Sequence, residues 1–113
     1  MVTAGTALRG EVWVCALPQP VGPHPVVVLT VNRIAEPLTW VNVALVTDTS
    51  GPQATHVPIG PDAGLTKYDE SYVHCADLHT VAKARLRRRL GLLAPAELRR
   101  VEDAVRLILG LQH

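Results

Sequence analysis

Polar side chains that could do chemistry stand where two apolar runs begin or end. His24 comes directly before a run that begins PVVVLT, and Thr47 follows the run WVNVALV. An imidazole can accept and donate a proton near neutral pH, and a hydroxyl can hydrogen-bond a bound group. The ends of rigid strands are favourable places for a site, so His24 and Thr47 are the first candidates. Thr49 and Ser50 follow Thr47 and are turn residues by default.

Two cysteines and several histidines raise the question of a metal site or a covalent nucleophile. The spacing of Cys15, Cys75, His74 and His79 matches no zinc-binding pattern, and alternate residues of a strand point to opposite faces. Ser71 lies near His74, but no acidic residue is in place to orient a triad. We therefore expect buried cysteines, surface histidines and no metal or other cofactor.

The arginines are unevenly distributed. The formal net charge is +1, from 11 Lys and Arg against 10 Asp and Glu, so charge alone neither indicates nor excludes a nucleic-acid partner. Four arginines stand almost together at Arg85, Arg87, Arg88 and Arg89. At a net charge near zero, such a run is more often a solvated face than a nucleic-acid surface.

The elements that must position these residues are mostly strands. Both apolar runs are rich in Val, which favours a pleated strand, and their apolar residues on both faces predict strands covered on both sides. Further strands are predicted at 9–17, 55–59 and 71–75. Pro58 places the fourth strand at a sheet edge or a strand end, and Pro37 interrupts the connection between the second and third strands.

The last third of the chain contains one ambiguous segment and one clear helix. Residues 77–93 fit a strand by alternation and a helix by their Ala and Arg content. The final segment predicts an amphipathic helix with Pro95 in its first turn and Gly110 at its end. Glu102 and Arg106 are spaced for an ion pair on the surface of that helix.

Several short strands followed by one helix predict a mainly β domain with a C-terminal helix, either α+β or a small β-barrel. With 113 residues the chain fits a single domain, expected at 9–113 after a flexible tail at 1–8. The N-terminus has no charged start followed by an apolar block, and no apolar run reaches membrane-spanning length. We expect a soluble, cytoplasmic protein with no membrane partner.

Between Arg9 and Leu111 the chain carries five segments in order: RGEVW, PVVVLT, VALVT, GLTKYDESYV with DLHTVAKARL, and GLLAPAELRRVEDAVRLILGL. With plausible spacing they resemble the RGDIW-type start, the RPVLVIS strand, the strand ending in Thr, the block containing QIRT and the closing segment of MazF/PemK-like toxins. These toxins belong to type II toxin–antitoxin systems and to the CcdB/MazF superfamily. No single segment is specific, and the ordered set carries the resemblance.

The resemblance implies an SH3-like small β-barrel of the CcdB/MazF type, usually a homodimer. It implies a sequence-specific endoribonuclease, an mRNA interferase, that cleaves single-stranded RNA without metal or ribosome. It also implies a cognate MazE-like antitoxin whose disordered tail fills the RNA groove.

The resemblance further implies a catalytic pair. The family has a Thr that closes the third strand, matched by Thr47, and an Arg just before the Pro of the second strand, where this chain has His24. A ribose 2′-hydroxyl that attacks its own phosphate needs a base, an acid and charge stabilisation. His24 could supply the base or the acid, and Thr47 could hydrogen-bond the phosphate. Arg33 or the 85–89 arginine run would replace the positive charge.

Further RNA contacts are expected beyond the catalytic pair. Asp77 and His79 stand where the family's QIRT block has Gln and Arg, and the loop before His24 is shorter than usual. Because His24 and His79 each stand where the family has an Arg, the groove lacks two expected cations, which indicates an altered target, weaker RNA binding or lost activity. The residues expected to contact RNA are Thr49, Ser50, Arg33, Asp77, His79 and Arg85.

Two other functions remain open. CcdB-like relatives inhibit DNA gyrase and cut no RNA, but their action usually depends on a C-terminal end that contains Trp, whereas this chain ends LGLQH. The chain could also be an inactive family member that only binds an antitoxin. RNA cleavage and gyrase supercoiling assays separate these functions.

Overall fold

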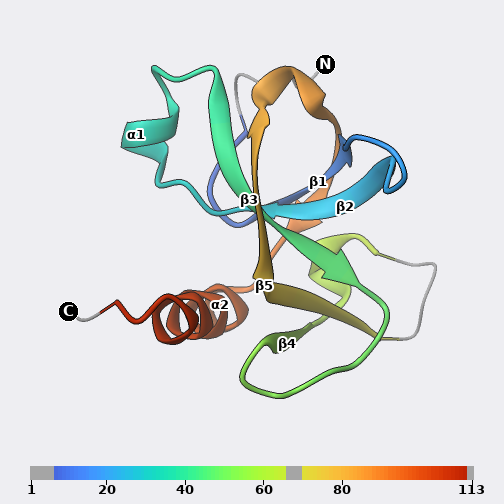
Figure 1. Cartoon of the computed structure of the whole chain (residues 1–113), viewed down its shortest axis with the longest axis vertical. Coiled ribbons are helices and arrows are strands. Elements are labelled where there is room, and N and C mark those ends of the chain that lie inside the picture. Colours follow the sequence, from blue (N-terminus) through green and yellow to red (C-terminus); the bar gives the residue numbers. More distant parts are fainter. Residues whose placement is uncertain (1–6, 66–69, 112–113) are drawn as a thin grey trace.

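The computed structural model describes residues 7–65 and 70–111, which form mainly strands with one long helix (Figure 1). The long helix α2 comes last, at Pro95–Ile108, and a short helix α1 spans Asn32–Ala35. This architecture confirms the predicted mainly β domain with a C-terminal helix. The strands are β1 Glu11–Ala16, β2 Pro23–Val28, β3 Trp40–Thr47, β4 His56–Ile59, β5 Ser71–Ala82 and β6 Leu86–Leu92, with 3₁₀ turns η2 Pro61–Ala63 and η3 Lys83–Arg85.

The six strands form one antiparallel sheet in the order β4-β5-β3-β2-β1-β6. β4 and β6 are therefore its edge strands, as Pro58 in β4 indicated. The sheet bends strongly, since β5 extends from β4 across β3 into the half of the molecule that contains β1 (Figure 1). It is not a closed barrel, which corrects the barrel expectation, because no hydrogen-bonded ladder joins β4 to β6 among the described residues.

Two glycines let the turn after β4 pack directly on β6. A Cβ on Gly64 would lie 1.9 Å from the carbonyl oxygen of Leu90, and one on Gly91 would lie 2.3 Å from the carbonyl oxygen of Asp62. Backbone crosses backbone here with no room for a side chain. This contact places the turn that follows edge strand β4 against the other edge strand, β6.

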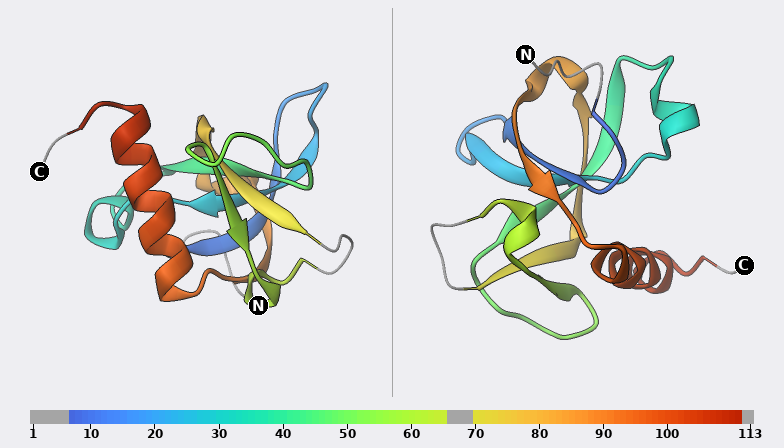
Figure 2. Two further views of the ribbon diagram at one scale, coloured as in Figure 1. Left: turned by 90° about the horizontal axis from the view of Figure 1, so that it is seen from below. Right: turned by 180° about the vertical axis from the view of Figure 1, so that it is seen from behind.

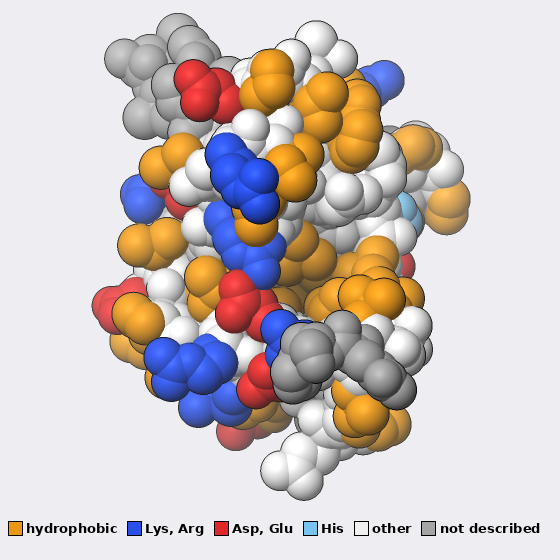
Figure 3. All heavy atoms as spheres, turned by 90° about the vertical axis from the view of Figure 1, so that its left-hand side faces the viewer, with side chains coloured by type: hydrophobic (Ala, Val, Ile, Leu, Met, Phe, Trp, Pro, Cys, Tyr) orange, Lys and Arg blue, Asp and Glu red, His pale blue; other side chains and the backbone are white. Residues whose placement is uncertain are grey.

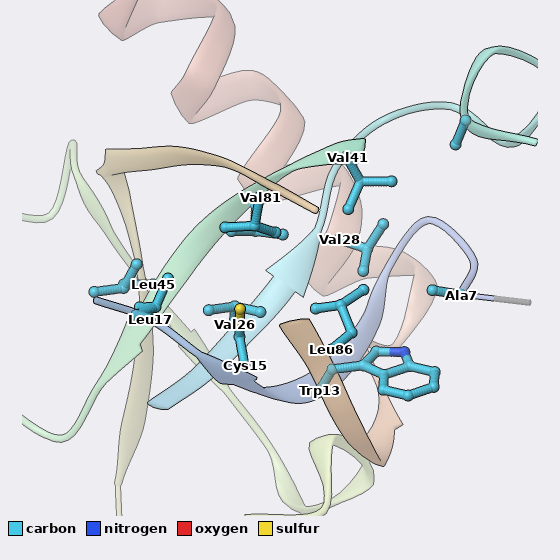
Figure 4. Packing of buried hydrophobic residues seen from close by; sticks show 12 residues of the cluster. Ala7, Trp13, Cys15, Leu17, Val26, Val28, Val41, Leu45, Val81 and Leu86 are labelled. Carbon is cyan, nitrogen blue, oxygen red and sulfur yellow. The ribbon is translucent and has the colours of Figure 1, made fainter. Parts of the chain in front are cut away.

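Core residues cover both faces of the central strands, as the valine-rich runs predicted. Val26 and Val28 pack on one face with Trp13 and Cys15, in the cluster drawn in Figure 4. Val27 packs on the opposite face, in the cluster that includes residues of α2. Alternate residues of β2 therefore serve two separate cores, because successive side chains of a strand point to opposite faces.

Helix α2 lies across one face of the sheet and packs against β4 and β5 (Figure 2). Its first turn begins at Pro95, and the Glu97 carboxylate accepts hydrogen bonds from the backbone N–H of Ala94 at 2.8 Å and of Gly60 at 2.5 Å. Gly110 has φ of 69° just after the helix, which confirms the predicted C-terminal glycine. Among the described residues, no helix is long and apolar enough to cross a membrane.

The predicted ion pair between Glu102 and Arg106 is absent. Glu102 instead bonds the guanidinium of Arg9, which precedes β1 and reaches α2, with Nε at 3.1 Å. Arg106 bonds Asp103 at 2.9 Å. The distant partner is better placed because Arg9 comes from a different element and meets Glu102 at a half-buried position.

Other element boundaries also differ from the sequence analysis. The fifth strand continues to Ala82, and the ambiguous segment contains a strand, β6. The connection after β2 contains the helix α1. Residues 1–6 of the expected tail lie outside the described residues, and Ala7 is already buried in the core.

Candidate active site

His24 and Thr47 lie together at one end of the β2–β3 pair. Val26 pairs with Leu45 in this ladder, and the same register continued by two residues places His24 opposite Thr47. Nε2 of His24 lies 2.6 Å from the carbonyl oxygen of Val46. Because a carbonyl only accepts, Nε2 donates the hydrogen, and Nδ1 is the ring nitrogen left to exchange a proton. The structure therefore brings the two predicted residues together.

The sequence before His24 forms a tight connection between β1 and β2. The N–H of Leu17 bonds the carbonyl of Gly22 at 3.2 Å, and the N–H of Val21 bonds the carbonyl of Pro18 at 3.1 Å. Gly22 has φ of 67°, a conformation that favours glycine. These contacts start β2 at Pro23 and pair His24 with Cys15 of β1.

The hydroxyl of Thr47 is oriented by the turn that follows β3. The N–H of Thr49 donates to Oγ1 of Thr47 at 3.1 Å. Because this bond uses a lone pair of the Thr47 oxygen, the Thr47 hydrogen is left to donate to a ligand. The Thr49 hydroxyl lies 3.4 Å from Oδ1 of Asp48, and Thr49 and Ser50 are exposed beyond the strand end.

A cavity of about 450 Å³ opens beside this pair. Its polar lining residues come from four strands or their ends, and the remaining lining residues are apolar or glycine. Asp48, Ser71 and Arg88 were not predicted to share this site, although Asp48 adjoins Thr47 in the chain and Arg88 belongs to the 85–89 run. The lining side chains with polar groups are His24, Thr47, Asp48, Ser71 and Arg88, and the rest of the lining is Val14, Pro23, Pro25, Val46, Gly64, Leu65 and Leu90.

The other residues expected to contact RNA do not line this cavity. Arg33 belongs to α1, which follows the far end of β2 from His24. Asp77 and His79 contact each other on β5, with Nε2 of His79 at 2.8 Å from Oδ1 of Asp77. Arg85 is exposed in η3. Their contact with RNA stays a prediction, and it would require a substrate that extends well beyond the cavity.

The described residues do not provide a set of metal ligands. The described residues contain no group of three or more His, Cys, Asp or Glu side chains that could hold a metal ion. Cys15 and Cys75 are fully buried, as predicted. Burial raises the pKa of the Cys75 thiol to about 11. Burial also raises the pKa of the Cys15 thiol, although the charges of Arg85 and Arg87 partly oppose this shift.

Ser71 and His74 do not form a nucleophile pair. Ser71 lines the cavity, whereas the ring of His74 packs on His56 with centroids 4.3 Å apart. Nδ1 of His74 is buried without a hydrogen-bond partner among the described residues. The ring of His74 therefore packs against β4 and does not line the cavity.

A second hollow, of about 600 Å³, lies between α1, β3 and α2. It is mostly apolar, and Figure 3 shows hydrophobic side chains beside Lys or Arg side chains on the side of the molecule where α1 and the end of α2 lie. Trp40 lines it and is 41% exposed, so Trp40 is not a core residue, whereas Trp13 is buried. None of its described lining residues lines the cavity beside His24.

Comparison with known proteins gives consistent matches. Residues 8–109 match the model of the PemK-like, MazF-like toxins of type II toxin–antitoxin systems. An endoribonuclease from a mycobacterial species is similar in structure, with a TM-score of 0.81 and 28% identity over 95% of this chain and 94% of that one.

Two further solved structures are similar over nearly their whole length. One is a mycobacterial endoribonuclease in complex with its cognate antitoxin, with a TM-score of 0.83 and 28% identity over 96% of this chain and 99% of that one. The other is the Mycobacterium tuberculosis toxin MazF-mt6, with a TM-score of 0.80 and 27% identity over 91% and 99% of the two chains.

Proposed function

Because the chain belongs to the PemK-like, MazF-like toxins of type II toxin–antitoxin systems, we propose that it is a cytoplasmic endoribonuclease that cuts single-stranded RNA beside His24 and Thr47. The observation that carries this proposal is the cavity itself, which an imidazole, a hydroxyl and a guanidinium line together. These groups match the needs of phosphodiester cleavage, which are proton transfer and stabilisation of charge on phosphate.

The proposed reaction is attack by a ribose 2′-hydroxyl on its adjacent phosphate. The 2′-oxygen bonds to phosphorus, and the bond to the 5′-oxygen of the next nucleotide breaks. The products carry a 2′,3′-cyclic phosphate and a 5′-hydroxyl. Nδ1 of His24 accepts the 2′-proton, because Nε2 is already bonded to Val46. The departing 5′-oxygen takes a proton from water, and the Thr47 hydroxyl donates to a phosphate oxygen. No metal takes part in these steps.

Cleavage of a long mixed-sequence RNA in the presence of EDTA tests this assignment. We expect wild-type protein to produce discrete fragments and His24→Ala to lower the rate by about 100-fold or more, since general acid–base groups typically contribute that much. Thr47→Val should also lower the rate by about 100-fold, because it removes a hydrogen-bond donor to the phosphate oxygen. Thr39→Val is the matched control, because Thr39 is exposed just before the opposite end of β3. It should cleave at the wild-type rate.

Three outcomes would contradict the assignment in different ways. Unchanged rates in both His24→Ala and Thr47→Val would place the reaction elsewhere on the molecule. Cleavage that EDTA abolishes would contradict the metal-free reaction. Failure of wild-type protein to cut any RNA, over a range of protein concentrations, would overturn the proposed function itself.

We also propose two protein partners, a second copy of the chain and a cognate antitoxin. Support comes from family membership and from the similar endoribonuclease solved with its cognate antitoxin. Exposed apolar side chains at Trp40, Leu107 and Leu109 provide surface that a partner chain could cover. Light scattering at micromolar concentration should give twice the mass of the 12.2 kDa chain, and a monomer mass would contradict the homodimer.

A further inference from the structure

We propose that Arg88 binds the scissile phosphate and supplies the positive charge that stabilises its transition state. This inference rests on the proposed function, and it names a further catalytic residue of that site. From the sequence, the source of the charge was open between Arg33 and the whole 85–89 run. The structure separates these candidates, because Arg88 is the one Arg or Lys among the described residues that lines the cavity with His24 and Thr47.

The strand register carries Arg88 to this position. Val14 of β1 pairs with Pro25 on one side and with Arg88 of β6 on the other. Residues paired across neighbouring strands share a face of the sheet, and these three all line the cavity. The backbones of Pro25 and Arg88 are then two strand spacings apart, roughly 10 Å. An arginine side chain and a phosphate group together can fill such a gap.

An irregularity in β6 separates Arg88 from its neighbours. Leu86 pairs with Cys15 and Arg88 pairs with Val14, so Arg87 is an extra residue on its strand. Such a bulge changes the face to which the following side chains point. Leu86 is buried in the core with Cys15, whereas Arg88 faces the cavity. Without the extra residue, simple alternation would give Leu86 and Arg88 the same face.

Arg89 shows the contrast within the run. It pairs with Trp13 in the ladder, and its Nε donates to Oε2 of the buried Glu11 at 2.6 Å. Arg89 is therefore committed to a structural ion pair. No carboxylate among the described residues lies within ion-pair distance of Arg88, and its side chain is exposed. With respect to the described carboxylates, its guanidinium is therefore available to meet an anion.

The chemistry of a guanidinium suits this role. It stays protonated under all ordinary conditions and presents a planar fork of donors that can hold two phosphate oxygens at once. Asp48 is the other charged side chain that lines the described part of the cavity when His24 is neutral. Removal of the Arg88 charge therefore leaves the described lining net negative, which opposes an RNA phosphate as well as failing to bind it.

Single-turnover cleavage of a short RNA in EDTA tests this proposal, with Arg88→Gln, Arg88→Lys and the control Arg99→Gln on α2. We expect Arg88→Gln to lower the rate by roughly 100- to 1,000-fold, the size of effect seen when one transition-state donor is removed. Arg88→Lys should recover part of the loss, because it restores charge without the fork. Arg99→Gln should stay within about threefold of wild type, because Arg99 is exposed and does not line the cavity, and an exposed charge outside the site is largely screened.

Three further measurements separate catalysis from folding and from simple RNA binding. Thermal unfolding of Arg88→Gln should match wild type, since the side chain is exposed and makes no ion pair with a described residue. The Kd for an RNA with 2′-O-methyl groups, which cannot react, should rise much less than the rate falls. Replacement of one non-bridging phosphate oxygen by sulfur should slow cleavage by wild type for one of the two stereoisomers. Arg88→Gln should cleave the two stereoisomers at similar rates.

The possible failures are distinguishable. If wild type and Arg88→Gln cleave equally while Thr47→Val is impaired, the Arg88 assignment is wrong and the proposed function stands. A loss of rate in Arg88→Gln that is matched in full by the rise in Kd would reduce Arg88 to an RNA-binding residue and overturn its catalytic role. If wild type cuts no RNA, the proposed function and the Arg88 role fall together.

Discussion

Each residue of the proposed catalytic pair is fixed through one polar atom and free at another. His24 donates from Nε2 to the Val46 carbonyl, and Thr47 accepts the N–H of Thr49. Each bond orients its side chain and leaves one group, Nδ1 or the hydroxyl hydrogen, to meet the substrate. Such pre-orientation lowers the cost of reaching the reactive arrangement, because little motion is left to restrict.

The sequence indicated this pair but could not single out Arg88. His24 and Thr47 follow from strand ends, which periodicity and the resemblance locate well. The position of Arg88 depends on an extra residue in β6, and no local pattern shows which of several arginines a bulge will turn toward a cavity. Arg33 is close to β2 in sequence, but it lies in α1, which follows the end of β2 opposite to His24. It therefore does not line the cavity.

Cys75 provides a residue-scale prediction about pH. Its thiol has a pKa of about 11 in the folded chain, raised by burial from an ordinary value of 9.0. Below pH 9 the thiol is protonated in both states, so its contribution to stability is fully present. As the pH rises from about 9 to 11, only the unfolded thiol ionises, and the free energy of unfolding should fall by roughly 2 to 3 kcal/mol.

Comparison of wild type with Cys75→Val isolates this effect from other groups that titrate in the same range. Urea unfolding at several alkaline pH values should show a steeper loss of stability in wild type than in the variant. Parallel pH dependence in the two proteins would contradict the burial of a protonated thiol at Cys75.

At the scale of elements, the site depends on how the two edges of the open sheet meet. The cavity wall includes Leu65, which follows η2, and Leu90 of β6. These residues are brought together where the backbone at Gly64 lies on the backbone of β6. The close backbone contact at these glycines thus places two walls of the cavity side by side, although the sheet is not a closed barrel.

Gly64→Ala should damage this contact. The new Cβ would lie 1.9 Å from the Leu90 carbonyl oxygen, and the backbone has φ of 79°, which strains any L side chain. Left-handed strain and overpacking together should cost about 3 kcal/mol or more. Gly110→Ala is the control, since Gly110 has φ of 69° with nothing within 4 Å of a new Cβ, and it should cost only about 1 kcal/mol.

Urea denaturation midpoints measure both glycine variants. RNA cleavage should also fall in Gly64→Ala because the cavity wall shifts. Equal stability losses in Gly64→Ala and Gly110→Ala would show that backbone strain alone matters, and that the turn after β4 does not pack tightly on β6.

Most elements were predictable from the sequence, and the exceptions have physical reasons. The valine-rich strands are continuous apolar runs and α2 has a helical apolar stripe, so both were predicted correctly. α1 was missed because it has four residues and is stabilised from afar, where the buried Lys83 ammonium donates to the carbonyl oxygen of Ala35 at 2.6 Å. β6 stayed ambiguous because its pattern of arginines and leucines fits helix and strand alike.

At the scale of the whole molecule, the two hollows lie on different parts of the surface. The polar cavity lies at one end of the β2–β3 pair, and the mostly apolar hollow between α1 and α2 has a different set of lining residues. A partner bound at the apolar hollow would therefore not need to touch His24 or Thr47. The small net charge of +1 is consistent with recognition of RNA by local groups such as Arg88, since no strong overall field is present.

The most direct test of the central claim is cleavage of one defined RNA that differs at a single atom. The cut site is first mapped with wild-type protein in EDTA, and the same RNA is then made with a 2′-deoxy sugar at that one nucleotide. We expect the all-ribose RNA to yield a 2′,3′-cyclic phosphate and a 5′-hydroxyl, and the deoxy substitution to abolish cleavage there. Continued cleavage at the deoxy position, or different product ends, would contradict a metal-free attack by the 2′-hydroxyl beside His24 and Thr47.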